Sequence, residues 1–412
     1  MSTEYPDLVI RRARLRARGS DLFDIAVSNG RISAIEPNLN IDFENEIDAK
    51  GNLVSESFVN PHLHMCKVWS LEKMDDLALV DYHSDGMSKA MSAINRAREV
   101  KRLLTYQSMV KGARRAAALA VVYGNLHIRA FADVDSISSL NGVKALIDVR
   151  DEFSGLVDIQ VAAFPQDGIL KDPGTADLMK EAMELGADVV GGIPWIELSD
   201  GDAMEHINIC FNLAQEYNKD VSMLLDDAGD SSLRTLEMMA LETIKRNWQN
   251  RALAHHCRAM GEYPLPYFYR LTELLRRAGL AIVTDPHTGP LHARVKELID
   301  QSILVSIGQD DISDAYYPFG RNNMLEVAFL ASHLLWMTTR EETGKLYDLI
   351  TIDAARSINI PEFGLAVGSP ANLVVLDQPN ELEALRFHRA PVCVVSKGKK
   401  VDIDRMRGIA EG

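Results

Sequence analysis

Cysteine is scarce in this chain of 412 residues. The chain has only Cys66, Cys210, Cys257 and Cys393, which lie far apart and form no CxxC pair. A disulfide framework is therefore not expected, and reduced thiols are typical of a cytoplasmic protein. The N-terminal MSTEYPDLVI also lacks the basic and long apolar segments of a signal peptide. We predict a cytoplasmic location.

Positive charge is also in short supply, with 44 Lys and Arg against 59 Asp and Glu and a formal net charge of −15. Such a chain repels polyanions, so nucleic acid is not an expected partner. The basic run RRARLRAR, residues 11–18, is interpreted as the solvated face of a strand and turn. No run of about 18 apolar residues occurs, so no membrane partner is expected.

Hydrophobic residues make up 47% of the chain and charged residues 25%, which is globular composition. Both ends alternate apolar and polar residues in short stretches, such as DIAVSNGRISAIEP near the start and APVCVVSKGKKV near the end. This pattern predicts short strands and turns at both ends of the chain.

The middle of the chain alternates apolar runs with longer helical patterns such as TADLMKEAMELG, DAMEHINICFNLAQEYN and LRTLEMMALETIKRN. Eight runs are predicted as strands: 56–64, 120–131, 158–166, 187–194, 220–226, 252–256, 280–286 and 303–311. Eight such units predict an α/β fold of the (β/α)8 barrel type, with the active site at the carboxyl ends of the strands.

Polar side chains end most of these predicted strands, where a barrel would bring them together although they are spread over the sequence. They are His62 and His64, Gln166, Asp226, His255 and His256, Asp285, and Asp310 and Asp311. Adjacent residues of a strand face opposite sides. We therefore expect only one of His255 and His256 to face the barrel mouth, where it could orient a metal-bound water or stabilise an oxyanion.

The HxH pair at the end of the first strand predicts a metal site, because neutral imidazoles are good ligands for zinc and iron(II). His62, His64 and Asp310 would supply three protein ligands, which is typical of a catalytic zinc site. Asp311 could instead be the ligand, or could hold its neighbour. Two alternatives remain open: the histidines could line a ligand pocket without a metal, and QDD could cap the following helix.

Several segments resemble the amidohydrolase superfamily, in its cytosine deaminase-like branch that includes N-isopropylammelide isopropylaminohydrolase. They are VNPHLHMCK, IQVAAFPQDGIL, GADVVGGIP, AHHCRAMGEY, GQDDISDAYYPFGRNNMLE and VGSPANLVVLD, in this order. The resemblance covers nearly the whole chain. It implies a barrel over residues 58–366 and a small β-sandwich formed by residues 1–57 and 367–412.

The resemblance also implies roles for individual residues. His62, His64 and Asp310 match metal ligands, His256 matches a catalytic histidine, and Asp227 matches the acid/base carboxylate. Gln166 matches a glutamine that hydrogen-bonds the ring amide of the substrate, and Asp311 and Tyr316 are expected beside it. The fourth strand ends without a lysine, so a single metal is implied.

Three departures from the family pattern bear on the site. Leu224 stands where relatives have a metal histidine on the fifth strand, so the metal is expected to bind weakly. Phe131 replaces a histidine on the second strand, and Trp195 replaces the histidine that follows Ile-Pro in cytosine deaminases. Both changes predict a more apolar substrate pocket.

The expected function is metal-dependent hydrolysis of a C–N bond, by deamination or dealkylamination, in a small nitrogen heterocycle with an apolar substituent. One divalent metal, zinc or iron(II), is the expected cofactor, and Asp227, His256 and Asp310 are the expected catalytic residues. Two alternatives remain: different or metal-independent acid–base chemistry on the same barrel, and a ligand-binding protein without catalysis. Besides its small-molecule substrate, a homo-oligomer is the expected partnership.

Overall fold

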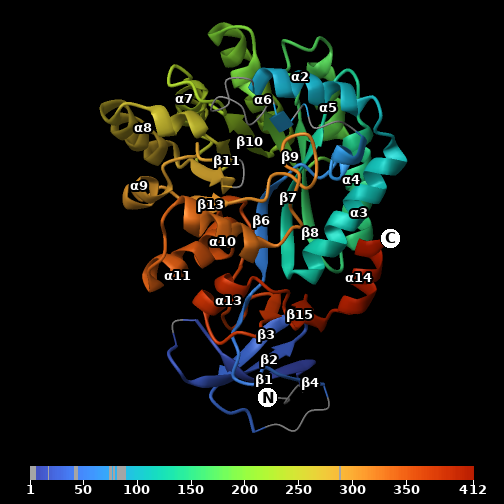
Figure 1. Cartoon of the computed structure of the whole chain (residues 1–412), viewed down its shortest axis with the longest axis vertical. Helices are drawn as coiled ribbons and strands as arrows, with labels where there is room; N and C mark the ends of the chain where they lie inside the picture. The colour runs from blue at the N-terminus through green and yellow to red at the C-terminus, as the bar shows by residue number, and fades with distance from the viewer. Residues whose placement is uncertain are drawn as a thin grey trace.

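The computed structural model describes residues 6–16, 18–40, 45–73, 77, 79–80, 90–286 and 289–412. Its centre is a sheet of eight parallel strands in sequence order, surrounded by helices (Figure 1). The strands are β6 (Phe58–Leu63), β7 (Asn125–Asp133), β8 (Asp158–Phe164), β9 (Val189–Gly192), β10 (Asp220–Leu225), β11 (Ala252–His256), β12 (Ala281–Thr284) and β13 (Val305–Ile307). All eight predicted strands are present, and the (β/α)8 barrel is confirmed.

The barrel closes between β6 and the segment after β13. The amide of His64 donates to the carbonyl of Asp310 at 2.8 Å, and the amide of Asp310 donates to the carbonyl of His62 at 2.9 Å. The side chain of Asn60 supports this seam, because its Oδ1 accepts from the amides of His62 and Gln309. The last join of the barrel is therefore made by the residues of the predicted metal site.

Helices cover the outside of the barrel. They are α2 (Ala90–Lys101), α3 (Tyr106–Val122), α4 (Asn141–Phe153), α5 (Thr175–Glu184), α6 (Asp200–Tyr217), α7 (Thr235–Lys245), α8 (Leu265–Ala278), α9 (Val295–Asp300), α10 (Met324–Leu334), α11 (Arg340–Leu349) and α12 (Ile352–Ser357). In α6, for example, the Ser199 side chain accepts from the Asp202 amide at the start, and Asn218 ends the helix in the left-handed conformation.

One predicted strand begins too early. The prediction for residues 120–131 was wrong over its first residues, because α3 continues to Val122 and β7 begins at Asn125. The run AAALAVV favours helix through its alanines, and Thr105 and Ser108 form a capping box at the start of α3. The apolar run thus belongs to two elements joined by a tight turn at Gly124, whose φ is +73°.

Both chain ends contribute to a pair of small sheets below the barrel (Figure 1). One sheet has the order β3-β2-β1-β4, from Arg31–Glu36, Leu22–Ser28, Leu8–Arg14 and Glu46–Asp48. The other has the order β16-β15-β14-β5, from Lys399–Lys400, Cys393–Ser396, Leu373–Val375 and Val54–Glu56. One apolar core joins residues of both sheets, including Ile10, Ile25, Val54, Leu373 and Val395. The predicted sandwich is confirmed.

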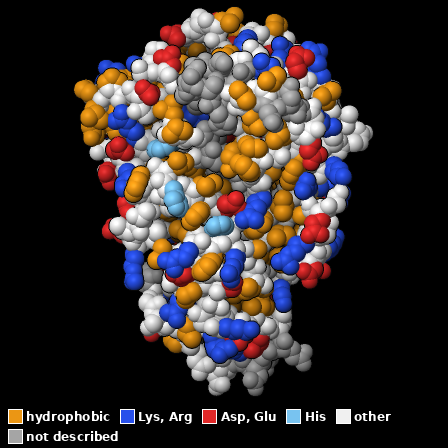
Figure 2. All heavy atoms as spheres, viewed as in Figure 1, with side chains coloured by type: hydrophobic (Ala, Val, Ile, Leu, Met, Phe, Trp, Pro, Cys, Tyr) orange, Lys and Arg blue, Asp and Glu red, His pale blue; other side chains and the backbone are white. Residues whose placement is uncertain are grey.

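The basic run lies on β1 and the turn after it, and three of its arginines, Arg11, Arg12 and Arg16, are paired with acids. Arg11 contacts Asp24 at 2.9 Å, and Arg16 contacts Glu56 at 3.0 Å. Basic and acidic side chains are interspersed over the face in Figure 2. All four cysteines are free and buried. Within the described part of the chain, no helix has the length and apolar character needed to cross a membrane.

Candidate active site

The predicted metal ligands meet at the carboxyl ends of the strands, and all of them are buried. Oδ1 of Asp310 lies 3.1 Å from Nε2 of His62 and 3.5 Å from Nε2 of His64. Neither His62 Nε2 nor Asp310 Oδ1 has a hydrogen-bond partner. Two ligands of a tetrahedral zinc ion, each about 2.0–2.1 Å from it, lie roughly 3.3 Å apart. The spacing to His64 is too long for a hydrogen bond, and both spacings are close to that expected between two ligands of one ion.

Two groups of possible metal ligands share Asp310. His62, His256 and Asp310 form one, and His64, Asp310 and Asp311 form the other, each with its ligand atoms within 4.8 Å. The structure thus brings Asp310 to both histidines of the HxH pair but also brings His256 beside His62. His256 therefore lies where it could compensate for the ligand that Leu224 lacks.

The pKa values of Asp310 and Asp311 are shifted in opposite directions. Although burial alone would raise the pKa of Asp310, the nearby His256, His62 and His64 hold it well below its ordinary value. Burial, together with the neighbouring Asp310 and Asp314, raises the pKa of Asp311 well above the ordinary range. The lowered pKa of Asp310 favours the ionised form that a metal ligand needs, whereas the raised pKa of Asp311 favours its protonated form. This contrast favours Asp310 over Asp311 as the ligand.

The two histidines of β11 both lie against His62, but only His256 lines the cavity at the barrel mouth, in line with the expectation that one of the pair would face it. His256 has φ of +63°, so the alternation of a regular strand ends there and its ring turns toward the mouth. The His62 ring centroid is 4.6 Å from that of His255 and 4.9 Å from that of His256. Burial lowers the pKa of His255, whereas Asp227, Asp310 and Asp285 raise that of His256 despite its burial.

A chain of hydrogen bonds runs from His62 down the inside of the barrel. Nδ1 of His62 lies 2.7 Å from Nδ1 of His255, and Nε2 of His255 lies 2.9 Å from Oγ of Ser222. Arg129 donates to Ser222 at 3.1 Å and to Oε1 of Gln160 at 2.9 Å. His255 is therefore the structural member of the pair, while His256 lines the cavity.

The adjacent carboxylates after β10 have separate surroundings. Asp226 accepts from the amide and hydroxyl of Thr235, at 2.7 and 2.6 Å, and from the Tyr263 hydroxyl at 2.6 Å, so it anchors the start of α7. Asp227 instead lines the cavity, with its Oδ1 3.1 Å from Nε of Arg258 and its Oδ2 4.0 Å from Nε2 of His256. Burial raises the pKa of Asp227, and the charges of Arg258 and His256 offset this only in part.

A small cavity of about 30 Å³ lies beside these groups. It is lined by His64, Lys67, Ile94, Gln166, Ile193, Trp195, Leu224, Asp227, His256, Asp310, Asp311 and Tyr316. Gln166, Trp195, Asp311 and Tyr316 thus lie where substrate-binding residues were expected. Phe131 does not line the cavity: its side chain lies a layer deeper, stacked on His62 with ring centroids 4.5 Å apart. The strand continues for two residues beyond Phe131, to Asp133, which explains its depth.

Lys67 is the main residue that the sequence interpretation missed. Its buried Nζ donates to Oε1 of Gln166 at 2.9 Å and lies 4.8 Å from the centre of the Tyr316 ring. Despite burial, the carboxylates of Asp133, Asp311 and Asp314 raise the pKa of Lys67 above its ordinary value. Its position three residues after His64, at the end of VNPHLHMCK, was the available signal.

Gly308 makes the crowding at the site possible. A Cβ on Gly308 would lie 2.4 Å from Oδ1 of Asp285 and 2.7 Å from Cβ of His62. Asp285, at the end of β12, in turn lies 3.1 Å from Nδ1 of His256. The glycine of the GQDD segment therefore lets strands β6, β12 and β13 bring their polar ends together.

Comparison with known proteins identifies one family and relatives within it. Residues 45–402 match the sequence model of the amidohydrolase family. N-isopropylammelide isopropyl amidohydrolase of Pseudomonas sp. (strain ADP) is 29% identical over 409 residues, covering 98% of this chain and 99% of that protein.

Solved structures agree over nearly the full length. 5-Methylcytosine deaminase from Klebsiella pneumoniae, liganded with phosphonocytosine, has a TM-score of 0.87 at 30% identity, over 95% of this chain and 97% of that chain. N-isopropylammelide isopropylaminohydrolase from Burkholderia multivorans has a TM-score of 0.82 at 25% identity, over 96% of this chain and 97% of that chain.

Proposed function

The chain belongs to the amidohydrolase family, and from this premise we propose that it hydrolyses an exocyclic C–N bond of a small nitrogen heterocycle with an alkylamino substituent. The observation that carries the proposal is the meeting of His62, His256 and Asp310 at the barrel mouth, with a buried imidazole nitrogen and carboxylate oxygen that lack hydrogen-bond partners. Relatives named for hydrolysis of N-isopropylammelide and deamination of 5-methylcytosine support this reaction class.

His62, His64 and Asp310 would hold one divalent metal, with zinc or iron(II) the ions that this donor set suits. When bound, the ion supplies Lewis-acid activation of water and of the bond to be broken. The apolar Leu224 beside it offers no lone pair, so we propose weaker binding than four protein ligands would give. His256 remains close enough to the same ligands to act as a proton donor beside them.

Asp227 and His256 would handle the protons of the reaction. The raised pKa of Asp227 places its proton exchange closer to neutral pH than that of an ordinary carboxyl group, and a general base works best near the operating pH. Arg258 keeps the carboxylate in place from the side away from His256. His256, whose pKa is raised, would deliver a proton to the leaving amine or stabilise a developing oxyanion.

Lys67 and Gln166 would orient the substrate. Because Lys67 has only donors, its bond to Oε1 fixes the Gln166 amide and leaves Nε2 to donate. The substrate group that faces Gln166 must then be an acceptor, such as a ring carbonyl oxygen. Trp195, Ile193, Leu224 and Ile94 form the apolar lining that would receive the alkyl arm.

The deciding experiment combines metal analysis with a substrate panel. Purified protein is assayed for zinc, iron and manganese, and the release of ammonia or isopropylamine is followed from cytosine, 5-methylcytosine and N-isopropylammelide. We expect about one metal per chain and the highest kcat/KM on the alkylamino compound. A preference for cytosine would refute the apolar-arm assignment. Turnover without metal would instead support acid–base chemistry by Asp227, Asp310 and His256, and bound compounds without turnover would identify a binding protein.

The cytoplasmic location and the homo-oligomer stay predictions. The oligomer would be checked by the molar mass of the purified protein in solution.

A further inference from the structure

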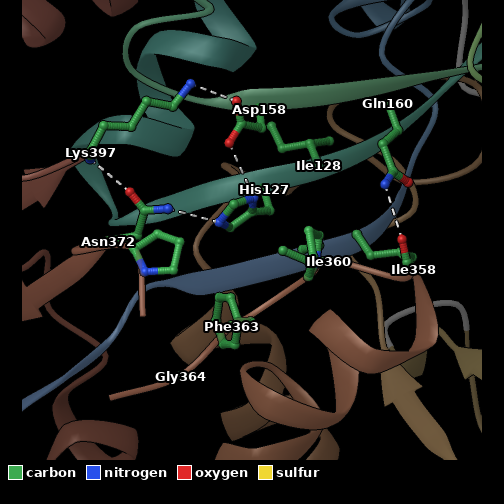
Figure 3. A pocket seen from close by; sticks show the side chains of 12 residues that line it. His127, Ile128, Asp158, Gln160, Ile358, Ile360, Phe363, Gly364, Asn372 and Lys397 are labelled. Carbon is green, nitrogen blue, oxygen red and sulfur yellow. Dashed lines mark hydrogen bonds and ion pairs between the residues drawn. The ribbon is translucent and has the colours of Figure 1, made fainter. Parts of the chain in front are cut away.

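A second cavity lies at the opposite end of the barrel, against the sheet that holds β14 and β15 (Figure 3). Its volume is about 420 Å³. It is lined by His127, Ile128, Asp158, Gln160, Ile358, Ile360, Pro361, Phe363, Gly364, Pro370, Asn372 and Lys397. His127 is the third residue of β7 and Asp158 the first of β8, so the cavity lies at the amino ends of the strands. It shares no residue with the active-site cavity.

Most of this wall is apolar. Ile358, Ile360 and Phe363 come from the segment after α12, and in Figure 3 the side chains of Ile360 and Phe363 lie across the cavity from His127. The rings of His127 and Phe363 are edge to face, with centroids 5.6 Å apart. A cavity of this size and lining suits a small organic molecule.

The polar groups gather on one side of the cavity. Asn372 Nδ2 lies 3.3 Å from Nε2 of His127, and the backbone amide of Lys397 donates to Asn372 Oδ1 at 2.8 Å. Lys397 Nζ binds Asp158 Oδ1 at 2.8 Å, so these two charges offset each other. Asp158 Oδ2 lies 3.6 Å from Nδ1 of His127, which is too long for a hydrogen bond.

These polar groups define the chemistry of an occupant. Burial lowers the pKa of His127 to about 4, so its ring is neutral at pH 7 and adds no charge. The rim as a whole then has no net charge and offers no counter-ion to a charged ligand. Asp158 Oδ2 remains an acceptor at the edge of an apolar space, and an N–H group is its natural partner.

We propose that this cavity binds a small, neutral aromatic molecule that has one N–H donor. The ring packs between Phe363 and Ile360, and the N–H group donates to Asp158. The site is separate from the proposed catalytic centre and does not depend on the reaction assigned to it.

Binding of 5-fluoroindole, followed by its ¹⁹F NMR signal, tests the proposal. The full-length protein should bind it with a Kd on the order of 0.1–1 mM, as expected for a ligand of about ten heavy atoms. 5-Fluorobenzofuran has the same shape without the N–H group and should bind about threefold to tenfold more weakly. Equal binding of the two compounds would refute the role of Asp158, and no saturable binding of 5-fluoroindole would overturn the site itself.

Amino-acid substitutions determine where on the protein 5-fluoroindole binds. Ile360→Trp fills the cavity and should weaken 5-fluoroindole binding at least tenfold. Phe363→Ala removes the facing ring and should weaken it about fivefold, which gives a second test if the larger tryptophan impairs folding. Asp158→Ala should remove the difference between the two probes. Asp227→Asn is the matched control in the active-site cavity and should bind as wild type; loss of binding in this control alone would place the probe at the catalytic end and overturn the proposal.

Discussion

The two ends of the barrel are built on the same strands, but their cavities differ in size and polarity. At the carboxyl ends, a cavity of about 30 Å³ is crowded with ionisable groups, among them His64, Lys67 and Asp227. At the amino ends, a cavity of about 420 Å³ has mostly apolar walls and a single ion pair, between Asp158 and Lys397. Barrel enzymes carry their chemistry at the carboxyl ends and use the other face for stability.

Residues with positive φ occur at both ends, among them Lys397 at the amino-end cavity, with φ of 49°. Asp226, His256 and Asp310 all have positive φ, of 46°, 63° and 63°, and all three end or follow strands at the catalytic end. The left-handed conformation costs a residue with a side chain roughly 1–2 kcal/mol. At His256 and Asp310 this cost falls on residues that line the cavity, and at Asp226 it falls on a carboxylate that binds Thr235 and Tyr263. The two ends therefore differ in size and polarity rather than in the presence of left-handed residues.

The strongest test of the catalytic end is Asp227→Asn. The change keeps the shape of the side chain but removes the base, so kcat/KM should fall about 10²–10⁴-fold. Asp226→Asn is the control, because Asp226 bonds Thr235 and Tyr263 and should mainly lower the thermal stability. Both are measured by steady-state kinetics on the best substrate of the panel and by thermal unfolding. If folded Asp226→Asn is the less active enzyme, the roles of the two carboxylates are reversed.

At the amino end we expect an effect of pH on stability rather than on catalysis. The pKa of buried His127 is lowered to about 4 in the folded chain, against about 6.5 when unfolded. Below pH 6.5 the unfolded chain binds a proton that the folded chain does not, so stability falls as the pH drops toward 4. Between pH 7 and pH 5 this contribution is about 2 kcal/mol.

Urea unfolding at the two pH values measures the effect of His127. The loss of stability from pH 7 to pH 5 should be smaller in His127→Gln than in wild type by that amount. The exposed His333→Gln, on α10, is the control and should leave the loss unchanged. An identical pH dependence in wild type and His127→Gln would contradict the burial argument.

Leu224→His makes the catalytic end still more polar and so increases its difference from the amino end. The added imidazole faces the cavity beside the metal ligands and should tighten metal binding, on the order of 10–100-fold if a neighbouring group orients it. Chelator competition compares wild type, Leu224→His and Leu224→Met, which keeps the apolar character. Equal affinity in all three at full occupancy would show that another residue, with His256 the first candidate, already fills the position.

The smallest effect is expected at Lys67. Lys67→Met removes the donor that fixes the Gln166 amide, so the KM for a ring-carbonyl substrate should rise about tenfold. The change in kcat should be smaller, because Lys67 lies away from the Asp227 and His256 pair. Lys67→Arg keeps donors at this position and should recover part of the loss. A fall in kcat with an unchanged KM would assign Lys67 to the chemical step instead.

The barrel could be predicted because most strands are apolar runs that end in a polar residue. The exception at residues 120–124 shows the limit of this pattern. AAALAVV reads as a buried strand by hydrophobicity alone, and its alanine content and the cap at Thr105 decide for helix. Closure of the barrel at Leu63 and Asp310 depends on long-range contacts that local patterns do not contain.

The residues of the site could be predicted, but the directions in which their side chains point were predicted less well. Strand alternation separated Asp226 from Asp227 and His255 from His256 as the structure does, although His256 also leaves the strand conformation. Phe131 was expected at the cavity and instead stacks beneath His62, since depth along a strand depends on where that strand ends. Lys67 was missed because it belongs to no metal-binding pattern and works through its contact with Gln166.

The hydrogen bonds below His62 also fix which atom donates and which accepts at each step inside the barrel. Arg129 can only donate, so Ser222 accepts from it. If His62 binds an ion through Nε2, its Nδ1 must carry a hydrogen and donate it to Nδ1 of His255. His255 then carries its own hydrogen on Nε2 and donates it to Ser222, whose oxygen accepts twice. Metal loading at the mouth would thus select the tautomer of a second histidine deeper in the barrel.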